Sequence, residues 1–144
     1  MTIERAWIDI PGRSIYFPAE VMKRRERFAL PLSGTMVALV EDALAAGDML
    51  YPGTRYLFPA KGGGPTAVVR ERTMPGRTGH LLRRTHKTMA LVAGISDLKS
   101  ALLLDHKMGN ISDVYTSAAA MHDDLVAQQE IVSAHILETA EANV

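Results

Sequence analysis

Residues 14–33 have the sequence SIYFPAEVMKRRERFALPLS, and this stretch decides how the fold begins. Its two ends, 14–18 and 28–32, are short runs of apolar and aromatic residues on either side of a charged tip that contains Lys23. Such an arrangement is typical of a hairpin. A third run, residues 6–10, alternates apolar and polar side chains. We therefore predict a small antiparallel three-stranded sheet.

The rest of the chain has helical signals. Ser33 is a suitable N-cap for a helix that we expect to end at Gly47, and a second helix is expected from Gly79 to Gly94. Ser96 precedes a short helix, and we predict two more, one starting near residue 111 and a long one from Ala118 to about Leu137. Strands come first and helices follow, which favours an α+β fold: the sheet, then a mainly α-helical bundle.

Apolar spacing predicts which sides of the two longer helices are buried. In the helix from Gly79, the expected face contains Leu81, Leu82, Thr85, Met89 and Val92. In the last helix it contains Met121, Leu125, Gln128, Val132 and Ile136.

Composition excludes several classes of protein. The 144 residues fit one domain, and the absence of cysteine excludes disulfides, thiolate nucleophiles and zinc sites built on cysteine. The N-terminus has no signal-peptide pattern, and no apolar run is long enough to cross a bilayer. We expect a cytoplasmic protein with no membrane partner.

The formal net charge is zero, from 16 basic and 16 acidic residues, but the charge is unevenly distributed. Residues 53–90 contain eight basic residues and one acidic residue, whereas residues 91–144 contain two and eight. A basic block that is also rich in glycine and proline can bind an anion or a phosphate backbone. A solvated surface loop is the ordinary alternative, and charge alone favours it.

Five polar residues are candidates for chemistry: Lys23, His80, Arg83, His106 and Tyr115. His80 and Arg83 are three residues apart and share a helix face. His106 follows an apolar helix, whose dipole favours a cation at that end. Taken singly, each has an ordinary structural interpretation, such as a surface arginine or a half-buried tyrosine. No histidine pair has the spacing of a zinc protease, and no phosphate-binding loop or nucleophile elbow is present. We predict neither a metal nor a cofactor.

Taken together, the same residues resemble the tyrosine recombinases, the phage integrase family. Residues 79–85, GHLLRRT, are similar to the His-x-x-Arg box of that family, and residues 102–106, LLLDH, to its Leu-Leu-Gly-His box. Tyr115 lies at the usual distance after the second histidine. Further similarities are Lys23 in a hairpin, the run ALPLS at 29–33 and the run YLFP at 56–59.

The resemblance covers nearly the whole chain, and it implies a partial catalytic domain over residues 1–144. Two departures stand out. Asp105 occupies the place where the family has glycine, and the chain starts too late to include the first arginine of the family or its N-terminal DNA clamp. Arg5 lies at a strand entrance and does not take that arginine's role. We expect a fragment with weak activity or none by itself.

The resemblance also implies a mechanism, site-specific DNA recombination through a 3′-phosphotyrosine intermediate. Tyr115 would attack the phosphorus. Arg83, His80 and His106 would bind the phosphate oxygens, and Lys23 would protonate the departing 5′ oxygen. Double-stranded DNA and other recombinase protomers are the expected partners, and the last helix could contact a protomer or cover its own core. The predicted DNA-binding residues are Arg24, Arg25, Arg70, Arg72, Arg77, Arg84 and Lys87.

Two other functions stay open. The chain could be a remnant that binds DNA or another recombinase subunit without catalysis. It could also be a structural or interaction protein with no affinity for DNA.

Overall fold

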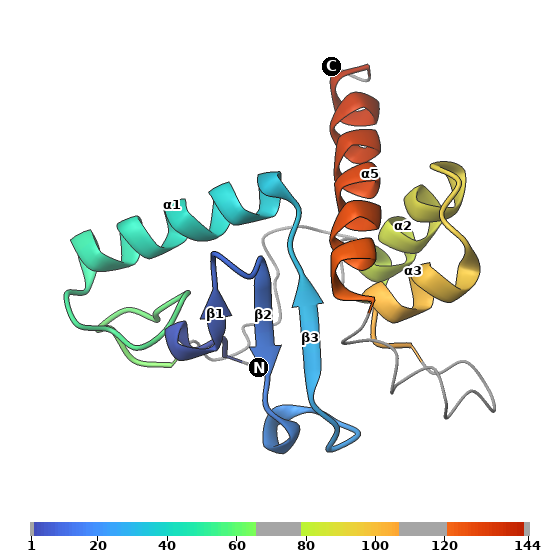
Figure 1. The fold of residues 1–144 in the computed structure, drawn as a ribbon. Coiled ribbons are helices and arrows are strands. Elements are labelled where there is room, and N and C mark those ends of the chain that lie inside the picture. The colour runs from blue at the N-terminus through green and yellow to red at the C-terminus, as the bar shows by residue number, and fades with distance from the viewer. Residues whose placement is uncertain (1, 66–78, 107–120, 143–144) are drawn as a thin grey trace. The chain divides into compact units, whose positions relative to one another are not determined.

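The structure is a computed structural model, and it describes residues 2–65, 79–106 and 121–142. Within these ranges it is an α+β fold, in which a three-stranded antiparallel sheet is followed by four α-helices (Figure 1). The chain divides into two compact units, Met1–Thr73 and Met74–Val144. Within the described ranges, no helix combines the length and the apolar character needed to cross a membrane.

The sheet of the first unit consists of β1 (Ile8–Asp9), β2 (Ser14–Phe17) and β3 (Phe28–Pro31), in the order β1-β2-β3. Both pairings are antiparallel, as predicted. The predicted first strand is shorter than expected, because Arg5–Trp7 forms a 3-10 helix, η1, in place of strand.

The connection from β2 to β3 contains a second 3-10 helix, η2 (Ala19–Val21), and the charged turn with Lys23. In the register of this hairpin, Phe17 is paired with Phe28 at the end where the connection begins. The prediction that Lys23 lies in a hairpin turn is therefore confirmed.

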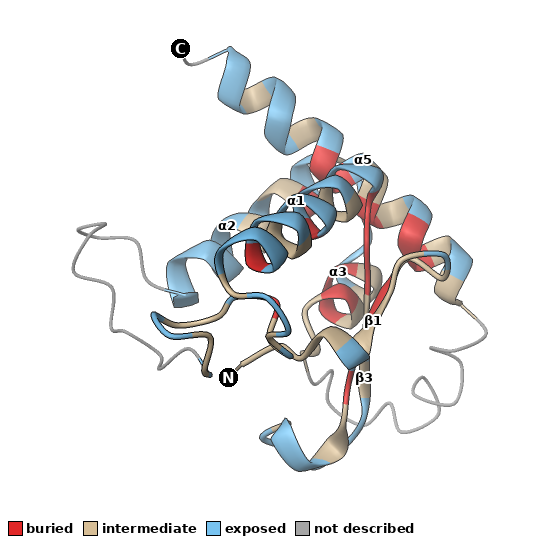
Figure 2. Ribbon diagram, turned by 90° about the vertical axis from the view of Figure 1, so that its left-hand side faces the viewer, coloured by how far each residue is buried: buried red, intermediate tan, exposed pale blue. Residues whose placement is uncertain are grey.

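Apolar side chains from the sheet and from α1 (Gly34–Leu50) form the core of the first unit. Trp7 packs edge-on against Phe17, with ring centroids 6.0 Å apart, and Phe28 stacks on Phe17 at 6.1 Å. The buried members are Ile15, Phe17, Leu32, Val40 and Leu57, and Figure 2 shows where burial concentrates along the ribbon.

The helix α1 begins as predicted but ends later. The Ser33 hydroxyl accepts a hydrogen bond from the Met36 amide at 3.2 Å, which satisfies one of the free N–H groups of the first turn. The expectation that Gly47 ends this helix is wrong, because the helix continues to Leu50. Gly47 is instead a buried position where a Cβ atom would lie 2.7 Å from Nη2 of Arg5.

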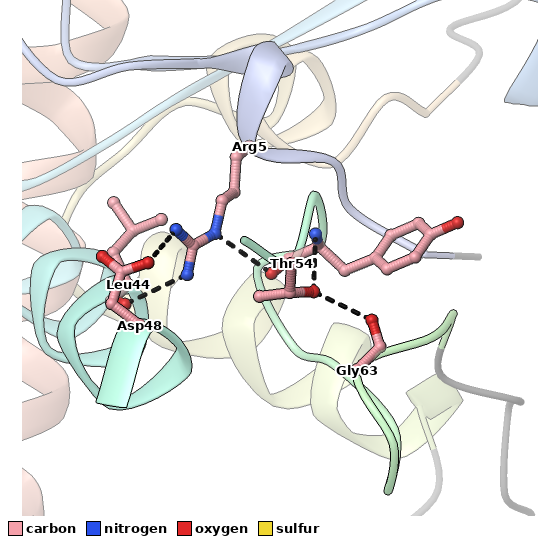
Figure 3. A network of polar contacts seen from close by, with 6 residues as sticks. Arg5, Leu44, Asp48, Thr54 and Gly63 are labelled. Carbon is pink, nitrogen blue, oxygen red and sulfur yellow. Dashed lines mark hydrogen bonds and ion pairs between the residues drawn. The ribbon is translucent and has the colours of Figure 1, made fainter. Parts of the chain in front are cut away.

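Arg5 joins three segments of the first unit (Figure 3). Its guanidinium donates to the Leu44 carbonyl of α1 at 3.1 Å and to the Tyr56 carbonyl at 3.3 Å, and it forms an ion pair with Asp48. In the same region, Thr54 donates to the Gly63 carbonyl at 3.0 Å. One side chain therefore ties η1 to α1 and to the segment at Tyr56.

The second unit is helical in its described part. It consists of α2 (Gly79–Val92), α3 (Asp97–Leu103) and α5 (His122–Glu141). The predicted caps are present: the Ser96 hydroxyl accepts from the Lys99 amide, and Gly94 adopts a left-handed φ of 83° after α2. The predicted helix near residue 111 lies outside the described residues. The buried core is formed by Ala90, Ile95, Leu103, Leu125 and Val132.

The predicted buried faces of this unit are only partly correct. In α5, Leu125 and Val132 are buried, but Gln129 is buried where Gln128 was expected. In α2 the expected apolar face is largely exposed, with Leu82 61% and Val92 66% exposed. The buried residue of α2 is Ala90.

We expect Arg5→Met to destabilise the first unit by roughly 1–2 kcal/mol, because it leaves two backbone carbonyls without their charged donor. Arg55→Met is the matched control, since Arg55 pairs with Glu4 at the surface and should contribute less than about 0.5 kcal/mol.

The effect of Gly47→Ala on the free energy of unfolding should be more stabilising in the Arg5→Met background than in the wild type. The reason is that the clash between the new Cβ and the Arg5 guanidinium then disappears. Urea unfolding followed by tryptophan fluorescence measures all four variants, and equal effects of the two arginine variants would contradict the expectation.

Candidate functional site

The candidate site is at the carboxyl end of α3, where the chain turns before His106. The His106 amide donates to the Ala101 carbonyl at 2.8 Å, and the Asp105 amide donates to the Leu102 carbonyl at 3.3 Å. These two bonds form a Schellman motif, in which the residue after the C-cap adopts the left-handed conformation. Asp105 has a φ of 50°, as the motif requires. Glycine is favoured at such a position because it has no Cβ.

Arg83 reaches this turn from α2. Its Nη1 donates to the carbonyl of Leu104, the C-cap of α3, at 2.9 Å. The last carbonyls of a helix have no intrahelical donors and form the negative end of its dipole, so a guanidinium is well suited to this position. Among the described residues this is the only hydrogen bond of the Arg83 guanidinium, which has five N–H donors in all.

The structure therefore brings Arg83 next to the segment that carries His106. His106 is half-buried, and Leu104, whose carbonyl accepts from Arg83, is two residues before it. His80 lies one turn before Arg83 on α2 and is exposed. The exposed Arg83 guanidinium has N–H donors left over with which it can bind an anion.

The predicted DNA-binding residues of this unit differ in their surroundings. Arg84 is exposed on α2. Lys87 forms an ion pair with Asp97 at the start of α3, with 2.9 Å between Nζ and Oδ1. Lys87 thus contributes to the contact between α2 and α3.

The remaining predicted residues lie elsewhere. Lys23 and Arg25 are exposed in the β2–β3 turn of the first unit, and Arg25 has a left-handed φ of 54°. Arg24, in the same turn, is 3.7 Å from a Glu26 carboxylate oxygen. Tyr115, Arg70, Arg72 and Arg77 lie outside the described residues.

The sequence did not indicate a buried polar network between α2 and α5. His86 Nε2 is 3.3 Å from the Gln129 side-chain oxygen, and the Gln129 amide nitrogen donates to the Ser133 hydroxyl at 3.4 Å. Gln129 is 4% exposed. The other ring nitrogen, Nδ1 of His86, is buried and has no hydrogen-bond partner among the described residues. Apolar spacing gives no signal for this network, because its members are polar.

Burial determines the charge state of His86. Loss of solvent around the ring lowers the pKa of His86 below its usual 6.5, and the hydrogen bond to Gln129 opposes this in part. The neutral imidazole is therefore favoured in the folded protein. In the described part of the chain, no three His, Asp or Glu side chains are grouped so that they could hold a metal ion.

Comparison with known proteins adds no family. No protein-family model matches the chain, and neither the curated proteins nor the solved structures contain a match to it.

Asp105→Gly is expected to stabilise the second unit by roughly 0.5–1 kcal/mol, because it removes the cost of a left-handed backbone with a Cβ. Asp105→Ala is the contrasting variant: it keeps the Cβ and loses the polar side chain that makes this conformation tolerable for aspartate, so it should destabilise by a similar amount. Urea unfolding followed by circular dichroism gives both values. Similar effects of the two variants would contradict the role of the left-handed turn.

The stability of the α2–α5 contact should fall as the pH falls below about 6.5. Above that pH His86 is neutral in both states; below it the unfolded chain binds a proton that the folded ring does not, until the lowered folded pKa is reached. The slope of the free energy of unfolding against pH stays below the limit of about 1.4 kcal/mol per pH unit for one proton. Partial exposure of the ring reduces this slope further. Hydrogen exchange of α2 and α5 amides between about pH 8 and pH 5 measures it, and His86→Leu should flatten the profile.

Proposed function

We propose that this chain takes part in site-specific DNA recombination and that it corresponds to part of a tyrosine-recombinase catalytic domain. The observation that carries the proposal is the hydrogen bond from Arg83 to the carbonyl at the end of α3. It joins the two segments that resemble the His-x-x-Arg and Leu-Leu-Gly-His boxes.

The backbone conformation of Asp105 also supports the proposal, although its side chain departs from the family. The family has glycine at this place, and here the residue has a left-handed φ of 50°. A left-handed residue is the one position of a Schellman motif where glycine has a clear advantage. The turn before His106 therefore has the geometry that the glycine of the family would favour, although the side chain differs.

In the proposed reaction, the Tyr115 hydroxyl attacks the phosphorus of a DNA phosphodiester and the 5′ oxygen leaves. The covalent product is a 3′-phosphotyrosine, and a 5′ hydroxyl from another strand then displaces the tyrosine. Arg83 offers donors to the non-bridging oxygens as charge builds there, and His80 and His106 add hydrogen bonds. Lys23 gives a proton to the leaving oxygen.

A second candidate function, binding to DNA without cleavage, is favoured by the exposed cations. Lys23 and Arg25 in the hairpin turn and Arg84 on α2 are exposed. Neutralising phosphates with such side chains gives affinity that falls steeply with salt. A partner protomer is a further proposal, for which the exposed Ile131, Ile136 and Leu137 of α5 offer apolar surface.

The test of catalysis uses end-labelled nicked duplexes with a randomised core. A 3′-phosphotyrosine adduct should form on the wild-type chain, at the low level expected of weak activity, and be retained under denaturing conditions. Tyr115→Phe should abolish it and Arg83→Gln should reduce it by about a hundredfold or more. Tyr16→Phe is the matched control, because Tyr16 is an exposed tyrosine of the first unit and the adduct should persist.

Mass spectrometry can locate the adduct without ambiguity. Cleavage after Lys107 leaves a C-terminal peptide in which Tyr115 is the only tyrosine. An undiminished adduct in Tyr115→Phe contradicts the assignment. Salt-dependent binding with no adduct supports the non-catalytic function instead, and no binding at low salt contradicts both.

A further inference from the structure

The three described helices of the second unit are held together in pairs by polar contacts. Lys99 of α3 is 3.0 Å from Asp124 of α5, and Lys87 of α2 is 2.9 Å from Asp97 of α3. The third pair, α2 with α5, is joined by the hydrogen bond between His86 and Gln129. The first two contacts are partly exposed ion pairs, whereas the third includes the buried Gln129. It is therefore the contact least weakened by water and salt.

The Gln129 side chain uses both polar atoms of its amide. The Gln129 amide nitrogen is used by Ser133, so the amide oxygen is the atom that faces His86. In this orientation of the amide, His86 donates to that oxygen through Nε2–H. Turning the amide over and moving the ring proton to Nδ1 would keep both bonds, with the Ser133 hydroxyl donating to the amide oxygen. The contact between His86 and Gln129 is therefore made in either orientation.

His86 and Arg83 project from the same side of α2, because they are three residues apart. One turn of helix therefore separates the buried bond to Gln129 from the Arg83 bond to the Leu104 carbonyl. The ion pair between Lys99 and Asp124 joins α3 to α5. The position of Arg83 relative to the end of α3 therefore depends on the direct Lys87–Asp97 contact and on how both helices are attached to α5.

We propose that Gln129 is a positioning residue for Arg83. By holding His86 through its amide oxygen, it fixes α2 against α5 so that the Arg83 guanidinium reaches the turn before His106. The significance of this position for phosphate binding rests on the proposed function. The coupling between Gln129 and Arg83 does not, and it can be measured by itself.

The variant is Gln129→Met, which keeps the length of the side chain and removes its acceptor oxygen. Gln128→Met is the matched control, since Gln128 is the neighbouring residue of α5 and bonds to Asp124 instead of His86. Gln129→Glu is the rescue variant, because it restores an acceptor oxygen. Nitrogen-15 NMR of the full chain reports the His86 tautomer, and hydrogen exchange compares the His106 amide with amides inside α3.

In the wild type, the bond to Gln129 should hold His86 in one predominant tautomer, Nε2–H in the orientation described. Gln129→Met should mix the two tautomers and speed exchange of the His106 amide about three- to tenfold more than exchange inside α3. Gln128→Met should change neither, and Gln129→Glu should return the exchange rate of the His106 amide toward the wild type, because the carboxylate can still accept from His86. Equal acceleration throughout the unit, or an unchanged His106 amide, overturns the positioning role. Failure of the proposed function appears elsewhere, as the absence of a Tyr115 adduct.

Discussion

The carboxyl end of α3 lacks intrahelical donors, and much of the second unit is arranged around supplying them. The chain supplies two from its own backbone by turning sharply through Asp105, and a third comes from Arg83 of another helix. Each donor depends on a different part of the sequence. The turn is local, whereas Arg83 is available only if α2 lies correctly beside α3. The need of the last α3 carbonyls for donors thus brings together two segments that carry candidate functional residues.

The first unit uses the same chemistry in another place. Arg5 donates to carbonyls of α1 and of the segment at Tyr56, and its space is kept open by Gly47. A guanidinium suits this role because its planar fork directs several donors at once. In each unit an arginine thus bonds to the backbone of a segment distant in the sequence. Sequence spacing alone cannot predict such a contact, because it is made at the end of a long side chain.

Local signals in the sequence predicted most of the elements. Ser33 and Ser96 cap their helices as expected, because capping depends on the nearest three residues. Gly47 misled the prediction, because a glycine inside a helix can reflect a neighbour from elsewhere in the chain. The burial of Gln129 was missed because its side chain is polar, and periodicity of apolar residues does not detect it. The hairpin that contains Lys23 was predicted from the apolar runs on either side of it, whereas the Arg83 bond to the Leu104 carbonyl and the pairing of Lys87 with Asp97 were not predicted.

The single tryptophan of the chain, Trp7, packs on Phe17 in the core of the first unit, and residues 74–144 contain one aromatic side chain, Tyr115. The core of the second unit is consequently aliphatic. The two halves of the molecule therefore differ in their optical properties. Tryptophan emission follows the sheet and its surroundings, while the helical circular dichroism also includes α2, α3 and α5. If the two signals change at different denaturant concentrations, the halves unfold as separate cooperative units.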